Sequence, residues 1–261
     1  MIDYTFSFGD LEAFLLIFVR VSSFVVTAPF FSTTNTPNQT KISFSILFAY
    51  LMFVAMPGVT VPSYSTVLGY SILILKEAVT GIIIGLGANL CLSIVQFAGK
   101  IADMEIGLSM MQLMNPLDMN DASGFMGTYY QYALVLIMLV TNFHHFFIRA
   151  LVETYTLIPI GGATFASDKI MSTMVAYMTD YVIISFRLCL PIVASMIMLN
   201  AVLGVLAKTS PQMNMFSVGI QIKVLAGLMI LFLTIGILPS ASDFIFEEMK
   251  VMMTSFVEAM Q

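Results

Sequence analysis

The amino-acid sequence predicts an all-α, multi-pass integral membrane protein with about six long apolar helices arranged as hairpins. Of its 261 residues, 59% are hydrophobic and only 10% are charged, and the mean hydropathy is +0.97. An ordinary soluble domain carries about 25% charged residues, so this composition argues against a soluble enzyme and against a disordered chain. The net charge of −5, without a basic cluster, argues against a nucleic-acid-binding protein.

Two helices are expected before the first long one. Asp10 is a suitable N-cap for a helix over residues 11–26, which carries Arg20 near its middle. After a polar loop, residues 42–56 form a second apolar run, and Pro57 ends it.

The third segment is unusually long. Only glycines interrupt residues 66–99, so we expect one helix of about 51 Å, which exceeds the apolar core of a bilayer. Lys76 and Glu77 lie inside it, and neighbouring residues do not face each other on a helix, so this pair cannot neutralise itself. Gly81 and Gly85 form a G-x-x-x-G pair that lets another helix approach closely.

Three further helices are expected, over residues 129–147, 181–206 and 218–238. Arg187 and Pro191 fall in the first turns of the fifth helix, and Pro239 is expected to end the sixth. An acidic, amphipathic tail follows over residues 243–261. No repeat or linker divides the chain, so residues 1–261 are predicted to form one domain.

Four charged residues interrupt the apolar segments: Arg20, Lys76, Glu77 and Arg187. A charge in hydrocarbon is costly, so such residues indicate either a functional site or a buried interface. Arg187 lies close to the expected helix start, which favours snorkelling to the membrane surface. For Glu77 we favour a buried interhelical or intersubunit partner over a proton relay, because no second carboxylate shares its helix face.

The sequence predicts no catalytic residue, no cofactor and no metal site. His144 and His145 are adjacent and diverge by about 100° on a helix, so they cannot bind a metal as an i, i+4 pair does. A structural or interface role is favoured for this pair.

The stretch from Met104 to Asn120 combines five methionines with glycine, asparagine and proline, so a single regular helix is not expected. Irregular backbone at membrane depth persists only inside protein or along a cavity. Flexible methionines can form an apolar constriction that gates by excluding water. An ordinary methionine-filled core loop is an equal alternative.

Several motifs occur in the order found in one known family. The clearest lies before and within the sixth helix and comprises Pro211, Gln212, Met213, Asn214, Phe216 and Lys223. Its Pro-Gln-Met-Asn-x-Phe element, residues 211–216, is the most discriminating. Further matches are Leu75-Lys76-Glu77, Gly107-Leu108-Ser109 with Asn115-Pro116, and His144-His145. On these motifs the chain resembles the FliR/SctT family of type III export-gate proteins. It departs from the family pattern at Gln221, where proline is usual, and at Phe143, where glycine is frequent.

The resemblance implies a non-enzymatic subunit, without a cofactor, of a flagellar protein-conducting channel. Its helical hairpins would pack in a hetero-oligomeric export gate with the FliP and FliQ subunits, next to FlhB and FlhA. Unfolded flagellar proteins would pass through this channel. The implied location is the bacterial inner membrane, in the flagellar basal body.

In that family a methionine-rich loop plugs the closed pore. The resemblance places the plug at about residues 107–118, with Met110, Met111 and Met114 as sealing side chains. The complete set of implied plug residues is Gly107, Met110, Met111, Leu113, Met114, Asn115, Pro116 and Leu117.

Two other functions compete with this interpretation. A multi-pass transporter of small solutes or ions would place Lys76 and Glu77 in its translocation path, and it would work without partner subunits. An intramembrane enzyme using His144 would lose activity, but not assembly, on His144→Ala. A gate subunit would require its partners.

Overall fold

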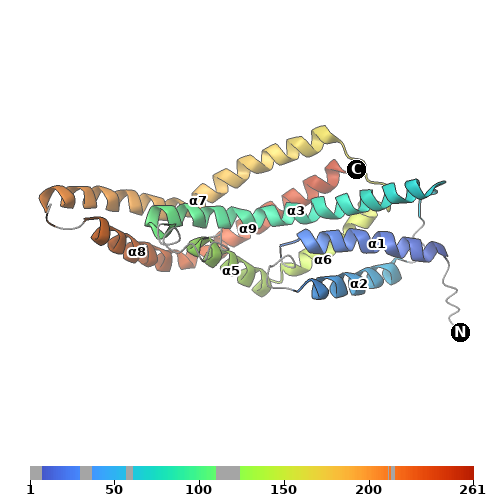
Figure 1. The fold of residues 1–261 in the computed structure, drawn as a ribbon, viewed down its shortest axis with the longest axis horizontal. Helices are drawn as coiled ribbons and strands as arrows, with labels where there is room; N and C mark the ends of the chain where they lie inside the picture. Colours follow the sequence, from blue (N-terminus) through green and yellow to red (C-terminus); the bar gives the residue numbers. More distant parts are fainter. Residues whose placement is uncertain (1–7, 30–36, 57–60, 110–123, 211, 213–214) are drawn as a thin grey trace. The chain divides into compact units, whose positions relative to one another are not determined.

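The structure, a computed structural model, describes residues 8–29, 37–56, 61–109, 124–210, 212 and 215–261 (Figure 1). These residues are helical or lie in turns and connecting segments, and none of them forms a strand. The helices are α1 (Phe8–Thr27), α2 (Asn38–Ala55), α3 (Val67–Ile106), α5 (Phe125–Val140), α6 (His144–Leu157), α7 (Ser167–Thr209), α8 (Met215–Thr234), the 3₁₀ helix η2 (Ile235–Ile237) and α9 (Leu238–Ala259). The predicted all-α fold is confirmed.

Within the described residues, three helical segments are long and apolar enough to cross a membrane: Val67–Ile106, Ser167–Thr209 and Val218–Ala259. The pair α5 and α6 becomes a fourth if the two are counted as one span, although they are bent by 74°. The fold is therefore that of a membrane protein, with fewer clear spans than the six long helices expected from the sequence.

The contacts group the chain into two compact units. Unit 1 comprises Met1–Leu90, Asn142–Tyr177 and Glu247–Gln261, and unit 2 comprises Cys91–Thr141 and Met178–Phe246. Three of the four boundaries fall inside α3, α7 and α9, so no linker separates the units in the sequence. The prediction of a single domain stays a prediction.

In unit 1, α1 packs on α3 at Gly81 and Gly85, the two glycines of the G-x-x-x-G pair. A Cβ on Gly81 would overlap the carbonyl oxygen of Arg20 and lie 2.9 Å from Cβ of Ser23, and one on Gly85 would overlap the Thr27 hydroxyl. Close approach of two helix backbones at G-x-x-x-G is thus realised here. On another side α1 contacts α2, with the rings of Phe14 and Phe53 packed edge to face at 6.2 Å.

The C-terminal part of α9 belongs to the core of unit 1. Met249, Met253, Phe256 and Met260 of this amphipathic segment are all buried. The Met260 carbonyl accepts a hydrogen bond from the backbone N–H of Thr164 at 2.9 Å. The expected acidic, amphipathic tail is therefore a helix whose apolar face is covered.

In unit 2, α3 and α5 approach at a pair of glycines. A Cβ on Gly99 would overlap the backbone of Gly127, so neither helix can carry a larger residue there without moving. Asp103 is buried and accepts the Met126 N–H at 3.1 and 3.0 Å, which satisfies one of the free donors at the start of α5.

Three predicted helix boundaries are wrong, each for an identifiable reason. The expected helix over 129–147 breaks at Asn142, which adopts φ 57°, a left-handed conformation that asparagine tolerates. The fifth helix, α7, begins at Ser167 and not near residue 181, because its first turns are polar and do not stand out in the hydropathy pattern. Pro191 therefore lies inside this 43-residue helix and not in its first turns. Pro239 does not end a helix but occupies the first turn of α9, where its missing N–H costs little.

Candidate functional site

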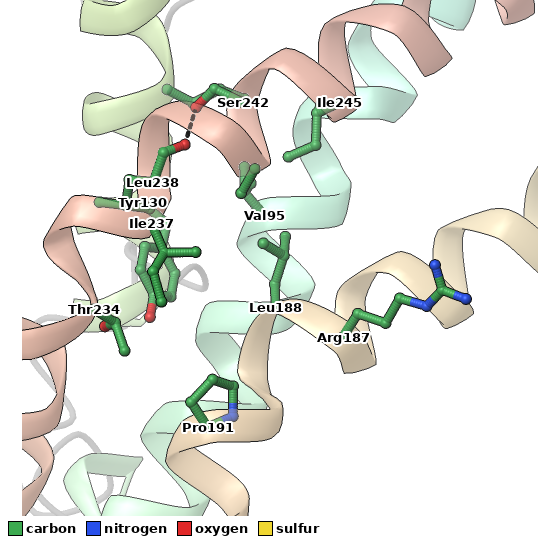
Figure 2. Close-up of a pocket in the computed structure, with 12 residues that line it drawn as sticks. Val95, Tyr130, Arg187, Leu188, Pro191, Thr234, Ile237, Leu238, Ser242 and Ile245 are labelled. Atoms are coloured by element: carbon green, nitrogen blue, oxygen red, sulfur yellow. Dashed lines mark hydrogen bonds between the residues drawn. The ribbon is translucent and has the colours of Figure 1, made fainter.

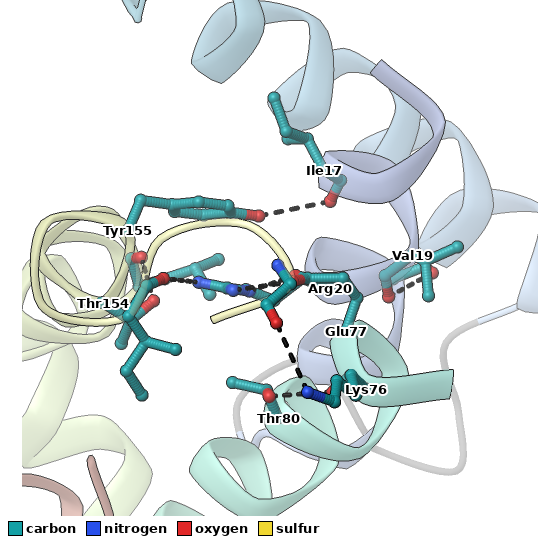
Figure 3. Close-up of polar contacts among 12 residues, drawn as sticks. Ile17, Val19, Arg20, Lys76, Glu77, Thr80, Thr154 and Tyr155 are labelled. Carbon is teal, nitrogen blue, oxygen red and sulfur yellow. Dashed lines mark hydrogen bonds and ion pairs between the residues drawn. The ribbon is translucent and has the colours of Figure 1, made fainter. Parts of the chain in front are cut away.

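The candidate site is a buried ion pair in unit 1, between Arg20 of α1 and Glu77 of α3 (Figure 3). Arg20 Nε donates to Glu77 Oε2 at 2.6 Å, and Nη2 donates to Oε1 at 3.0 Å. Both side chains are fully buried. A two-pronged pair of this kind is the strongest geometry available to a guanidinium and a carboxylate.

The remaining polar atoms of this pair are also satisfied by the chain. Arg20 Nη1 donates to the carbonyl of Ile158 at 3.0 Å, and the backbone N–H of Gly161 donates to Glu77 Oε1 at 2.8 Å. The ring of Tyr155 covers the guanidinium at 4.2 Å, as Figure 3 shows. The Tyr155 hydroxyl donates to the Ile17 carbonyl at 3.3 Å, which fixes the ring against α1.

The loop after α6 positions two of these groups. The backbone N–H of Gly162 donates to the Pro159 carbonyl at 2.9 Å, and Gly161 has φ 72° in the turn between them. A type II turn requires this positive φ at its third residue, which glycine adopts without strain. A Cβ on Gly161 would also lie 2.7 Å from Cδ2 of Leu73. The turn therefore depends on this glycine.

Lys76 lies beside the pair but is not part of it. Its side chain is half-buried, and Nζ lies 3.5 Å from the Gly161 carbonyl oxygen. As expected, Lys76 does not pair with Glu77: Glu77 accepts from the Gly161 N–H and pairs with Arg20, whereas Lys76 reaches only the Gly161 carbonyl.

The ion pair can act as a fixed junction among α1, α3 and the loop at 158–161. The sequence left open whether the buried partner of Glu77 lies on another helix of this chain or on another subunit. Its partner is Arg20, on helix α1 of the same chain. Sequence reasoning identified both charges but did not pair them, and it missed Tyr155 and the carbonyl of Ile158. The adjacent Ile158-Pro159 and Gly161-Gly162 are the sequence signals that a turn lies close to the pair.

Arg187 in unit 2 differs from the expectation. It lies near the middle of α7, not close to a helix end, and it is exposed. Its stem lines a cavity of about 90 Å³ that Leu188 and Pro191 of the same helix also line (Figure 2). None of the described carboxylates lies within ion-pair distance of its guanidinium.

Much of the predicted plug and hairpin motif lies outside the described residues. This holds for Met110, Met111, Leu113, Met114, Asn115, Pro116, Leu117, Pro211, Met213 and Asn214. Gly107 is described, follows the end of α3 and has φ 92°, so it interrupts the helix as expected. Gln212 is an exposed turn residue, Phe216 belongs to α8, and Lys223 is a half-buried residue of the same helix.

His144 and His145 begin α6 directly after the bend, with ring centroids 4.1 Å apart. In the part of the chain that the structure describes, no three His, Cys, Asp or Glu side chains gather into a possible metal site. His144 is half-buried and His145 is exposed, and the structural or interface role of this pair stays a prediction.

Comparison with known proteins extends over nearly the whole chain. Residues 11–249 match the family described as "Bacterial export proteins, family 1". Among curated proteins, the flagellar biosynthetic protein FliR of Bacillus subtilis is 30% identical over 228 residues, covering 87% of each chain. FliR of Aquifex aeolicus is 29% identical over 94% of this chain and 93% of its own, and FliR of Escherichia coli is 24% identical over 88% and 87%.

Proposed function

The chain belongs to family 1 of the bacterial export proteins, and from this premise we propose that it is a membrane-embedded subunit of the flagellar protein-export gate. In this role it forms part of the protein-conducting channel with FliP and FliQ in the bacterial inner membrane, next to FlhB and FlhA. Unfolded flagellar proteins pass through the assembled channel. The function is structural and requires no cofactor.

The observation that carries the proposal is the family match from residue 11 to 249, which is nearly the full chain. The distribution of apolar surface supports it. In the span Val218–Ala259, only 6% of the most apolar window is buried within the chain, and in Ser167–Thr209 only 28% is. Such surface must be covered by lipid or by other subunits.

The experiment that tests this role is affinity purification of the tagged chain from its native membrane, together with export of flagellin by a strain lacking it. We expect FliP and FliQ to co-purify, and secreted flagellin to be absent from the deletion strain and restored by the intact gene. A chain that purifies alone, transports a solute after reconstitution and is dispensable for flagellin export would be the competing transporter.

Residues 107–118 act as the plug of the closed channel in this proposal. The positive φ of Gly107 at the end of α3 supports a change of chain direction where the plug begins. We expect deletion of residues 110–114 to leave FliP and FliQ co-purifying while the membrane becomes leaky to ions. Wild-type ion permeability of the assembled deletion variant would refute the plug. The control variant Met198→Ala with Met229→Ala, at two exposed methionines of α7 and α8, should not raise permeability.

A further inference from the structure

The last turn of α3 contacts two other helices of unit 2. Asp103 and Ile106 lie three residues apart on this turn, and both are buried. Asp103 accepts the Met126 N–H at the start of α5, whereas the Ile106 side chain packs against α8. Residues three apart are neighbours on one turn of a helix, so a shift of this turn moves both side chains together.

The contact between α3 and α8 is close. A Cβ on Gly227 of α8 would lie 2.6 Å from Cδ1, 2.7 Å from Cγ1 and 3.1 Å from Cγ2 of Ile106. Isoleucine is branched at Cβ and has few accessible rotamers, and this one is fully buried. Its side chain therefore has little freedom to turn away from α8, and a displacement of α8 toward α3 moves the last turn of α3 itself.

The rest of α8 is held loosely by its own chain. Among residues 218–234, the part of α8 whose burial the structure describes, only Gly219 and Gly227 are buried. A Cβ on Gly219 would lie 3.8 Å from one side-chain atom of α7, which is an ordinary contact. Leu225 and Phe232 are each 72% exposed. The close packing of α8 within unit 2 is therefore concentrated at Gly227.

The start of α5 is fitted to Asp103. Gly124 occupies the N-cap position with φ 75°, a conformation that favours glycine, and it carries no side chain that could cap the helix. A Cβ at this position would overlap Oδ2 of Asp103. The carboxylate of Asp103, at 3.1 and 3.0 Å from the Met126 nitrogen, takes the place of the missing cap. The cap of α5 is thus supplied by α3, and it depends on where the last turn of α3 lies.

We propose that the position of α8 controls the N-terminal cap of α5 through the last turn of α3. A displacement of α8 onto Ile106 shifts this turn, and Asp103 shifts with it away from the Met126 N–H. The coupling is reciprocal, so loss of the cap also loosens α8. It rests on contacts within unit 2 and not on the export role.

Hydrogen exchange of the full chain, in whatever complex it purifies, tests this coupling. Gly227→Ala adds the Cβ that displaces α8 from Ile106. We expect the first amides of α5 to exchange about fivefold faster, the change produced by loss of one helix cap, while the amides of α1 in unit 1 exchange as before. Gly219→Ala, on the same helix, meets only an ordinary contact and should leave α5 unchanged.

A double-mutant cycle tests the route through Ile106. Ile106→Ala removes the three side-chain atoms that the new Cβ would meet. In this background, addition of Gly227→Ala should no longer accelerate exchange at the start of α5. If Gly227→Ala does not give a folded protein, Asp103→Ala tests the reverse direction, and the amides of α8 around residue 227 should then exchange faster.

Unchanged exchange of the first α5 amides in folded Gly227→Ala would overturn the proposal, as would unchanged exchange of α8 in Asp103→Ala. An acceleration that persists in the Ile106→Ala background would exclude the last turn of α3 as the route. An equal effect of Gly219→Ala, or faster exchange throughout both units, would mean a general loss of stability and would contradict the coupling as well.

Discussion

Arg20 and Arg187 are the same residue type on two apolar helices, and the two units treat them in opposite ways. In unit 1, Arg20 is fully buried and its guanidinium contacts a carboxylate, a carbonyl and an aromatic ring of the same chain. In unit 2, Arg187 is exposed and pairs with none of the described carboxylates. The chain supplies every partner of Arg20 by itself, whereas it supplies no described carboxylate to Arg187.

The difference arises from the backbones around each arginine. Gly81 and Gly85 let α1 approach α3 closely, and the turn at Gly161 brings an N–H to Glu77. Around Arg187, exposed neighbours such as Phe186 and Leu190 extend the apolar surface of α7. A charge on an apolar helix is therefore paired within the chain in the first case and has no carboxylate partner among the described residues in the second.

The largest expected effect is that of Glu77→Ala. The substitution leaves Arg20 buried without its carboxylate, which destabilises a protein by about 3–5 kcal/mol. We expect a much lower thermal unfolding midpoint of the purified chain and poor recovery from membranes. The matched variant Arg187→Gln removes an exposed charge and should change stability by about 0.5 kcal/mol or less.

Replacing both partners distinguishes the stranded charge from lost packing. Arg20→Met combined with Glu77→Met should recover part of the stability lost in Glu77→Ala, because well-packed apolar side chains can replace a buried pair. The recovery is incomplete since the Ile158 carbonyl and the Gly161 N–H lose their partners. If the double variant were less stable than Glu77→Ala, the stranded-charge explanation would be wrong.

The sequence predicted the composition of these sites better than their geometry. The helix class, the close approach at Gly81 and Gly85, and the two charges of the buried pair follow from residue type and spacing. The pairing itself joins residues 57 positions apart, and no local pattern encodes it. The sequence around Gly161 signals a turn, but not that its N–H meets Glu77. The start of α7 was misplaced because its first turns are polar, so hydropathy marks where the apolar stretch begins and not where the helix begins.

A second prediction compares glycines in the two units. Gly81→Ala should destabilise unit 1 by about 1–3 kcal/mol, because the added Cβ overlaps the carbonyl oxygen of Arg20 and α1 must move. Gly204→Ala in α7 meets open space and should stabilise that helix by up to about 1 kcal/mol. Thermal unfolding midpoints of the two variants should therefore shift in opposite directions. Similar midpoints would contradict the close packing of α1 on α3.

A third prediction concerns Asp103, the buried acid of unit 2, whose carboxylate accepts a hydrogen bond from a backbone N–H and is not paired with an arginine. Asp103→Ala removes the acceptor for the Met126 N–H at the start of α5 and should cost about 1–2 kcal/mol. Asp180→Ala, at an exposed position of α7, is the matched control and should have little effect. Hydrogen exchange of the first α5 amides measures the loss locally. Unchanged protection there would exclude the capping role.

The smallest expected effect is the loss of an exposed contact in unit 1 at high pH, in comparison with the buried Arg20–Glu77 pair. The hydroxyl of Tyr64 donates to the carboxylate of Glu12 in α1, and this hydrogen bond raises the pKa of Tyr64 above its usual value of 10.0. A raised pKa means that the contact is intact below pH 10 and is lost as the pH rises through the higher value, because a phenolate cannot donate and repels Glu12. The ultraviolet titration curves of the unsubstituted chain and of Tyr64→Phe should differ by one tyrosine that titrates above pH 10. Only the unsubstituted chain should lose a contact between Tyr64 and α1 in that pH interval. The Arg20–Glu77 pair is fully buried and still joins α1 to α3 when the Tyr64 contact is lost, so unit 1 should stay folded throughout. Unfolding of unit 1 in the same pH interval would mean that the exposed contact, rather than the buried pair, holds α1 on α3.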